Sequence, residues 1–161
     1  MPVQLNQKER MLLQDQQNHE QLCIQKYNKY ANETQCPQLK QLFQTHASHE
    51  QQHYDTLGQI LSGQAPSINQ GQQAQGQVQQ NQMSGLQSPT SSKGYNQDDA
   101  TMANDMLTTE KYISGTYDTS IFECRDSNIR QALNHIQKEE QQHGEDLYNY
   151  MQAHGMYNTQ A

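Results

Sequence analysis

The chain contains one tetrapeptide twice, as Glu50-Gln51-Gln52-His53 and, ninety residues later, as Glu140-Gln141-Gln142-His143. A lone glutamate stands thirty residues before each copy: Glu20 before the first and Glu110 before the second. Within each copy, Glu and His at positions i and i+3 share one helical face. Four carboxylates and two imidazoles in this arrangement form the ligand set of a carboxylate-bridged two-metal site in a four-helix bundle. Their four negative charges would balance two divalent cations.

The spacing brings these residues to one level. The midpoint between Glu20 and Glu50 falls in segment 32–37, which carries helix stop and restart signals. If the chain turns there, each glutamate lies about 15 residues from the turn, roughly 22 Å along the hairpin at about 1.5 Å per residue. The midpoint of the second half falls in segment 123–128, which carries similar signals. We therefore predict two antiparallel helical hairpins, each with its carboxylates at one level.

The two halves are an internal repeat. Nine glutamates and seven histidines in this chain predict about 0.4 Glu-x-x-His matches by chance, so one match alone would be weak evidence. Two matches with the same upstream glutamate offset indicate a repeated hairpin. The shift of ninety also aligns Asp15 with Asp105, Tyr27 with Tyr117, Glu33 with Glu123, Gln41 with Gln131 and Leu57 with Leu147. The alternative is that these are solvated residues on polar faces, as most glutamates and histidines are.

The apolar pattern disfavours that alternative. Each expected helix has an apolar stripe at helical spacing, and the candidate ligands interrupt it. In the fourth helix the stripe consists of Ile129, Ala132, Leu133, Ile136, Leu147 and Tyr150. Burying four ionised carboxylates at one level of a small core is prohibitive unless cations or protons neutralise them. A bound metal pair is the simplest explanation.

Length and composition fit a single domain. The chain has 161 residues, of which only 32% are hydrophobic, so a large core is out of reach. We predict one all-α domain over residues 1–161: a ferritin-like four-helix bundle made of two repeated antiparallel hairpins. Its helices are expected at about 6–31, 37–61, 98–123 and 127–153, with a low-complexity Gln-rich crossover at 62–97 and a flexible tail at 154–161. One long crossover is the ferritin-like connectivity. A plain tether between two independent hairpins that dimerise remains the alternative.

The net charge and the lack of targeting signals limit the possible partners and the place of synthesis. The net charge of −7 argues against nucleic acid or an anionic membrane as partner. No apolar run approaches the roughly 20 residues of a membrane helix, and the N-terminal residues lack the features of a signal peptide, so we expect synthesis in the cytoplasm. The three cysteines, Cys23, Cys36 and Cys124, form no Cys-x-x-Cys pair. We expect them to be free thiols in a reducing compartment.

The donor atoms also suggest the metal. Mixed carboxylate and imidazole donors suit iron or manganese and, less specifically, zinc. We expect Glu50 and Glu140 to bridge both ions. The remaining predicted ligands complete the two coordination spheres: Glu20, His53, Glu110 and His143.

Metal-bound imidazoles usually donate their other ring N–H to a carboxylate, a carbonyl or water. Four acidic residues are candidates for this outer position: Asp15, Asp55, Asp105 and Glu145. His46 and His49 stand at helical spacing from His53, but the shift of ninety places them on Ile136 and Glu139. The repeat therefore does not support them as ligands. We expect them, with His19, His135 and His154, to be surface or satisfied core residues.

Two tyrosines stand near the predicted ligands. Tyr27 and Tyr117 lie two helical turns from Glu20 and Glu110. They could be redox-active neighbours of the metals. The commoner role is that of a core tyrosine with a hydrogen-bonded hydroxyl.

The two hairpins together resemble known protein families. The paired arms with the two Glu-Gln-Gln-His copies look like the ferritin-like superfamily, which includes rubrerythrins and manganese catalases. More narrowly, residues 102–150, through Asp105-Met106-Leu107, Lys111-Tyr112 and Tyr117, are similar to the spore coat protein F family. The Gln-rich and Tyr-rich composition fits that group. The resemblance implies synthesis in the mother-cell cytoplasm, deposition on the spore coat, and other coat proteins or further copies of the chain as partners.

Two functional classes follow. The first is a coat F-like spore coat protein whose di-iron or di-manganese centre has a structural or accessory redox role. The second is a metal-dependent oxidoreductase, such as a manganese-catalase-like or peroxide-consuming enzyme. A complete ligand set favours metal binding, because a purely structural bundle would gain stability from apolar residues at these positions. Since the Cys pairs of a rubredoxin-like module are absent, the sequence argues against a rubrerythrin-type peroxidase. Whether the protein is an enzyme stays open.

Overall fold

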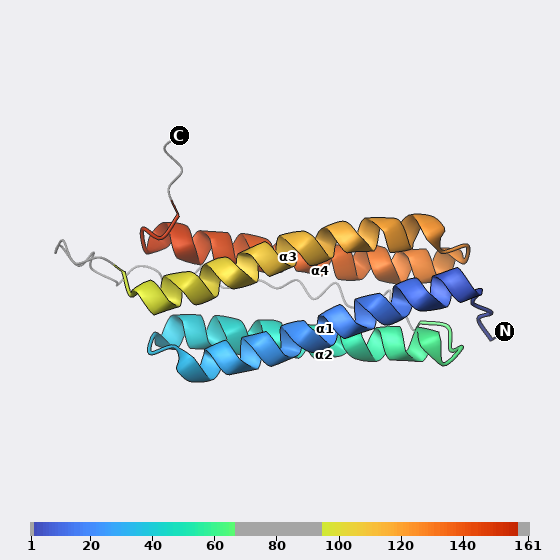
Figure 1. Cartoon of the computed structure of the whole chain (residues 1–161), viewed down its shortest axis with the longest axis horizontal. Coiled ribbons are helices and arrows are strands. Elements are labelled where there is room, and N and C mark those ends of the chain that lie inside the picture. The colour runs from blue at the N-terminus through green and yellow to red at the C-terminus, as the bar shows by residue number, and fades with distance from the viewer. Residues whose placement is uncertain (1, 67–94, 158–161) are drawn as a thin grey trace, which may run out of the picture.

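Four long helices make up the protein. The computed structural model describes residues 2–66 and 95–157, and the central part of the predicted crossover, 67–94, lies outside them. The helices are α1 (Gln7–Glu33), α2 (Pro37–Leu61), α3 (Gln97–Glu123) and α4 (Ser127–Ala153). Helix α1 packs on α2 and α3 on α4, with no strand in the described parts of the chain (Figure 1). The prediction of an all-α bundle built from two hairpins is confirmed.

Side-chain caps fix where the helices begin. The Asn6 side chain accepts a hydrogen bond from the backbone N–H of Glu9, whose own carboxylate accepts one from the N–H of Asn6, a reciprocal capping box. Asn96 caps α3, where its side chain accepts a hydrogen bond from the backbone N–H of Asp99. These two pairs of residues are also ninety positions apart, so the repeat includes the helix starts. Asp126 caps α4.

The two hairpins lie with their turns at opposite ends of the bundle (Figure 1). The backbone N–H of Arg125, in the second turn, donates to Glu9 at the start of α1 (2.9 Å). The Tyr150 hydroxyl, near the end of α4, donates to the Cys36 sulfur in the first turn (3.3 Å). Neighbouring helices from different hairpins therefore run antiparallel. Cys36 lies in the first turn and Cys124 in the second, so the two cysteines are at opposite ends of the bundle.

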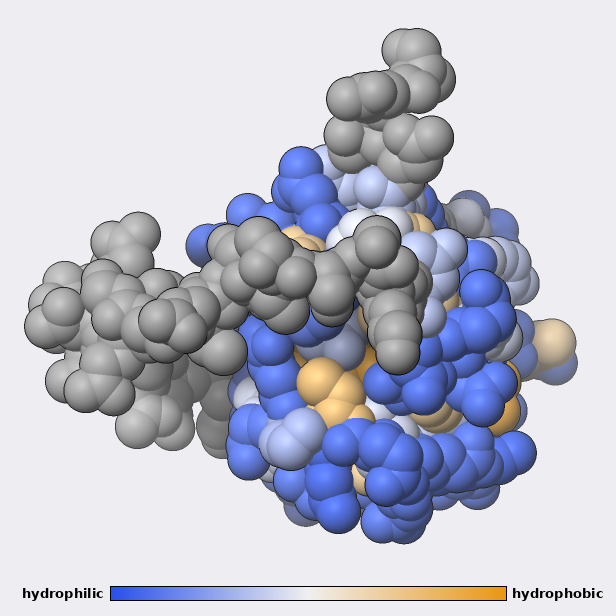
Figure 2. Space-filling model, turned by 90° about the vertical axis from the view of Figure 1, so that its left-hand side faces the viewer, coloured by the Kyte–Doolittle hydropathy of each residue, from blue (hydrophilic) through white to orange (hydrophobic). Residues whose placement is uncertain are grey.

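The core is apolar toward both ends and charged in the middle. Its largest fully buried apolar side chains are Tyr27, Tyr117, Phe43, Leu13, Leu39, Leu57, Ile60, Met106, Ile113, Ile129, Leu133 and Ile136. Hydrophilic side chains cover most of the end of the bundle seen in Figure 2. None of the helices in the described ranges is long and apolar enough to cross a membrane.

Polar contacts join α1 to α3. The Gln16 side-chain amide donates to the Ser120 hydroxyl (3.1 Å), and both side chains are buried. Toward the other end, Lys26 forms an ion pair with Asp105 (2.9 Å). The Tyr30 hydroxyl donates to the same carboxylate (2.6 Å). The two hairpins are therefore joined on this side by hydrogen bonds and an ion pair in addition to the apolar core.

Candidate metal centre

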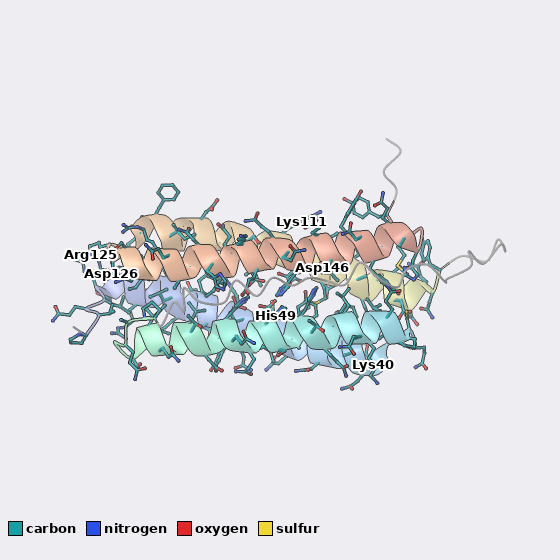
Figure 3. All side chains as sticks on the ribbon, turned by 180° about the vertical axis from the view of Figure 1, so that it is seen from behind. Lys40, His49, Lys111, Arg125, Asp126 and Asp146 are labelled. Atoms are coloured by element: carbon teal, nitrogen blue, oxygen red, sulfur yellow. The ribbon has the colours of Figure 1, made fainter. Side chains whose placement is uncertain are left out.

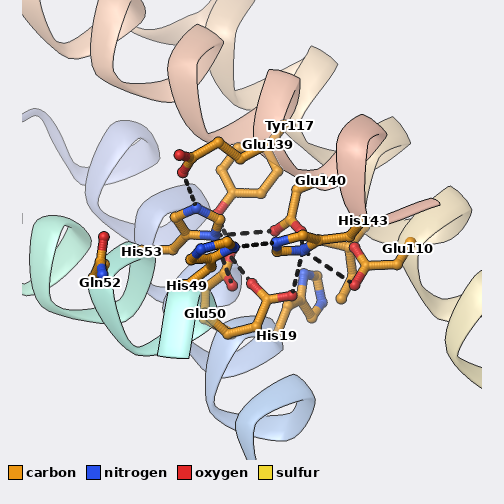
Figure 4. Close-up of polar contacts among 12 residues, drawn as sticks. His19, His49, Glu50, Gln52, His53, Glu110, Tyr117, Glu139, Glu140 and His143 are labelled. Carbon is orange, nitrogen blue, oxygen red and sulfur yellow. Dashed lines mark hydrogen bonds and ion pairs between the residues drawn. The ribbon is translucent and has the colours of Figure 1, made fainter. Parts of the chain in front are cut away.

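The six predicted ligands meet at mid-bundle, and each is at most 2% exposed. Their side-chain donor atoms form two groups, and the chosen atoms of each group all lie within 4.8 Å of one another. The groups are Glu20, Glu50, His53 and Glu140, and Glu50, Glu110, Glu140 and His143. Glu50 and Glu140 occur in both groups, which is the placement that the sequence predicts for bridging ligands. We call the first group the His53 position and the second the His143 position (Figure 4).

The repeat explains how the groups are built. In the His53 position, α1 and α2 supply three residues and α4 supplies only Glu140. In the His143 position, α3 and α4 supply three residues and α2 supplies only Glu50. Any ion in either group would therefore contact both hairpins.

Both imidazoles direct the same ring atom inward. The Nδ1 atom of His53 lies 3.0 Å from Glu50 Oε2 and 3.5 Å from Glu140 Oε1. The Nδ1 atom of His143 lies 3.2 Å from Glu50 Oε1 and 3.3 Å from Glu140 Oε2. The two Nδ1 atoms thus lie beside the carboxylates shared by both groups.

Several of these buried atoms have no hydrogen-bond partner in the described parts of the chain. They are Glu20 Oε2, Glu50 Oε1, Glu110 Oε2, both carboxylate oxygens of Glu140, and His143 Nδ1. Carboxylate oxygens lie within 3.5 Å of His143 Nδ1, yet none is placed in line for a hydrogen bond. Unpartnered polar atoms are rare in protein interiors because their burial is costly. Six at one level are costly unless protons or cations supply the missing partners.

Tyrosines join each hairpin to the other. The Tyr27 hydroxyl on α1 donates to Glu110 on α3, and the Tyr117 hydroxyl on α3 donates to Glu20 on α1. Both tyrosines are fully buried. They have the hydrogen-bonded hydroxyl of core tyrosines, and each one orients a predicted ligand from the opposite hairpin. A redox role for them stays a prediction.

The outer ring nitrogens of His53 and His143 contact residues other than those expected from the sequence. The Nε2 atom of His53 lies 2.6 Å from Glu139 Oε2, and the Nε2 atom of His143 lies 3.0 Å from His49 Nδ1. The expectation that one of four other acidic residues fills this role is wrong. Asp15, Asp55 and Glu145 point to solvent, and Asp105 bonds to Lys26 and Tyr30.

The outer partners His49 and Glu139 occupy equivalent positions of the sequence repeat. His49 and Glu139 each stand directly before the glutamate of a tetrapeptide, so the shift of ninety aligns them. Each reaches the histidine of the opposite hairpin, which is a contact that the pattern within one hairpin does not reveal. His49 is half-buried on the side of α2 that faces Asp146 on α4 (Figure 3).

His46 is a satisfied core residue, as expected. It is buried, and its Nδ1 atom lies 3.2 Å from the Tyr27 hydroxyl. Its Nε2 atom lies 3.2 Å from Asp146. Because burial lowers the pKa of His46, the ring favours its neutral form.

The two terminal glutamates keep their charge. Burial opposes the ionisation of Glu110, but the nearby His143 ring, with Nδ1 3.5 Å from Glu110 Oε1, outweighs it and lowers the pKa of Glu110 to about 2. Burial likewise opposes the ionisation of Glu20, and the nearby His53 ring, with Nδ1 3.6 Å from Glu20 Oε2, contributes most to lowering its pKa.

The two shared glutamates and both histidines hold protons instead. Burial and the charges of the terminal glutamates raise the pKa of Glu50 to about 7 and that of Glu140 well above its usual range. Burial lowers the pKa of each histidine, but the surrounding carboxylates outweigh it. They raise the pKa of His53 well above its usual range and that of His143 to about 12. Protons thus neutralise the carboxylates where metal ions would otherwise do so.

A cleft of about 480 Å³ opens between α3 and α4. Its floor includes Glu110 and Glu140, and Leu107, Gly144 and Tyr148 form much of its wall.

The matching place between α1 and α2 is filled differently. The shift of ninety aligns Gly144 with Tyr54 and Leu107 with Gln17. The side-chain amide of Gln17 donates to the backbone carbonyl of Tyr54 (3.3 Å). The wall of the α3–α4 cleft thus has a glycine where the first hairpin has a tyrosine.

The second hairpin is similar to a known domain family. Residues 98–160 match the family model of the Coat F domain. This stretch includes Glu110, Glu140 and His143. A search of curated proteins and a search of solved structures each returned no match. The match supports a spore coat protein and a location in the spore coat, as the sequence resemblance implies. The second hairpin of this chain is thus similar to the Coat F domain, over residues 98–160.

Proposed function

We propose that this protein is a spore coat component whose bundle holds two divalent metal ions, iron or manganese, between its two hairpins. The observation that carries the proposal is the set of six buried, unpartnered carboxylate and imidazole atoms at mid-bundle, counted over the described residues. Two divalent ions would supply a partner for these atoms and balance the four carboxylate charges.

The donor set fits these metals. Each position offers three carboxylates and one imidazole, a mixture of oxygen and nitrogen that suits iron or manganese and, less specifically, zinc. Both imidazoles direct Nδ1 toward the shared carboxylates and use Nε2 for an outer contact, the usual arrangement of a metal-bound histidine. When bound, iron or manganese would supply Lewis-acid and redox chemistry.

The same arrangement supports a structural role. Each position takes residues from both hairpins, and α1 and α3 also share polar contacts. Ions at mid-bundle would therefore link the hairpins at the level where the core holds carboxylates and imidazoles. The antiparallel order of neighbouring helices supports a ferritin-like bundle. Other coat proteins or further copies of this chain are the proposed partners.

Elemental analysis tests the proposal. Protein loaded with Fe²⁺ or Mn²⁺ without oxygen and then desalted should hold about two ions per chain, the number expected of this ligand set. The double variant Glu50→Gln with Glu140→Gln removes both shared carboxylates with little change in shape and should hold almost none. The matched control, Glu33→Ala with Asp55→Ala, removes two exposed carboxylates and should keep both ions. A wild-type protein that remains free of metal would refute the proposal.

The cleft between α3 and α4 favours a second candidate function, a peroxide-consuming oxidoreductase of the manganese-catalase type. Its floor includes two predicted ligands, Glu110 and Glu140, so a small substrate in the cleft would lie beside the centre. This candidate predicts oxygen evolution from hydrogen peroxide by the loaded protein, and loss of that activity in the double glutamine variant. A protein that binds metal and leaves peroxide unchanged has the structural role alone.

A further inference from the structure

We propose that the two metal positions are unequal: the His53 position binds its ion more tightly, and the His143 position is exchangeable and takes a small ligand through the cleft between α3 and α4. This inference rests on the proposed metal binding. Two independent features support it: the residue behind each histidine, and the space beside each position.

The residues behind the two histidines differ in charge. His53 has the Glu139 carboxylate 2.6 Å from its Nε2 atom, whereas His143 has the His49 imidazole at 3.0 Å. A carboxylate that accepts the Nε2 hydrogen makes Nδ1 a stronger metal ligand and also adds negative charge near the cation. A neutral imidazole accepts a weaker hydrogen bond and adds no charge. The ion held by His53 is therefore bound more tightly.

The space beside the two positions also differs. Glu110 belongs only to the His143 position, and it lines the cleft. Gly144 contributes no side chain to the cleft wall, whereas the aligned residue of the first hairpin is Tyr54. Both differences between the halves act in one direction: the position with the weaker outer partner is also the one beside the open cleft.

The cleft suits a small uncharged ligand. The exposed lining of the cleft is mostly apolar and includes Leu107 and the Tyr148 ring, so a charged molecule would lose hydration along most of the wall. Polar residues with charges of both signs also line it: Lys111, Ser114, Gln141 and Glu145. Small neutral molecules, such as a diatomic gas or hydrogen peroxide, have the chemistry that this path admits.

Titration of the metal-free protein with Mn²⁺ tests the inequality, with free Mn²⁺ followed by electron paramagnetic resonance. The wild type should bind two ions in two steps. Glu139→Gln should weaken the tighter step by about 10-fold to 100-fold, the usual effect of losing such an outer partner. Glu33→Gln removes the same charge from an exposed site at the end of α1, away from the cleft, and should change neither step.

The complementary variant, His49→Glu, gives the His143 position the outer partner of its counterpart. It should strengthen the weaker step and bring the two steps together. Circular dichroism establishes that each variant keeps its helices. Two equal binding steps in the wild type, or weakening of the weaker step by Glu139→Gln, would overturn the proposal. Absence of any metal binding would instead refute the proposed function on which it rests.

Nitric oxide probes the cleft as a small uncharged ligand. Added to the Fe²⁺-loaded wild type, it should form one iron-nitrosyl species per two irons, detected by visible absorption. Gly144→Tyr gives α4 the residue that α2 has at the aligned position, and it should slow this reaction without loss of iron. A Cβ atom there would meet Leu107 at 3.8 Å, an ordinary contact, and circular dichroism establishes that the variant keeps its helices.

Gly115→Tyr is the matched control for the cleft. A Cβ atom at Gly115 would meet nothing within 4 Å, and this glycine is not among the residues that line the cleft. This variant should react with nitric oxide like the wild type. Equal rates in the Gly144→Tyr variant and the wild type, or two nitrosyl species per two irons, would overturn the proposed path.

Discussion

Metal loading should release about three to four protons per chain near pH 7. Without metal, His143 has a pKa of about 12 and the pKa values of His53 and Glu140 are raised well above their usual range, so each of these groups keeps a proton. Glu50, with a pKa of about 7, is about half protonated. Ligation requires the ionised carboxylate and the neutral imidazole, so these protons must leave as the ions enter.

The metal affinity should increase with pH. Protons are products of metal binding, so by mass action a lower proton concentration favours the bound form. With about three to four protons released, the overall constant for binding two ions should rise roughly a thousandfold to ten-thousandfold from pH 6 to pH 7. The increase should continue above pH 7, where Glu140 and both histidines still hold protons, and become shallower as Glu50 ionises.

Calorimetry measures the proton count directly. Mn²⁺ is titrated into the metal-free protein at pH 7 in two buffers with different ionisation enthalpies, and the difference in heat gives the protons released. The double variant Glu50→Gln with Glu140→Gln should show neither binding nor release. If two ions bind with one proton released or none, the carboxylates are ionised and the imidazoles neutral before metal enters. That result would refute the electrostatic reasoning.

Four further predictions concern the metal-free protein. Its melting temperature should decrease as the pH rises from 5 to 8. The folded-state pKa of Glu50, about 7, exceeds the ordinary 4.5, so the ionisation of Glu50 in this range destabilises the folded state. Thermal scans at several pH values test this. Glu140→Gln should leave the free energy of unfolding in urea unchanged within about 1 kcal/mol or raise it, because the carboxyl is already neutral; a large loss would contradict this. Asn6→Ala should cost about 1 kcal/mol in the same assay through loss of the α1 cap, with Asn18→Ala, in mid-helix, as its comparison. Gly115→Ala should add about 0.5–1 kcal/mol, because a helical glycine there has open space beside it; destabilisation would show an unseen contact.

The sequence was informative where the physics is local. Helical periodicity places Glu50 and His53 on one face, and the distance to the turn places Glu20 at their level. The repeat applies the same reasoning to the second half. These arguments predicted the two hairpins and the six residues that meet at mid-bundle. Their role as metal ligands stays a prediction.

The outer contacts were less predictable. Asp15 and Asp55 looked suitable because a metal-bound histidine commonly has a carboxylate behind it, yet both point to solvent. Glu139 and His49 reach the histidines because α2 and α4 of different hairpins pack antiparallel beside each other. The rotation of one hairpin against the other decides such contacts, and no periodicity within a single helix encodes it.

The repeated Glu-Gln-Gln-His by itself determined the symmetry of this protein: two equivalent hairpins, each bringing the same residues to the same level. The halves also differ in sequence, at His49 against Glu139 and at Tyr54 against Gly144, but only the tertiary structure decided that these differences lie beside the two positions. It placed a carboxylate behind His53 and an imidazole behind His143, and it left a cleft beside the second position. The physical reason is that ligand spacing depends on the rise and twist of one helix, whereas charge and space around a buried group depend on all the helices packed against it.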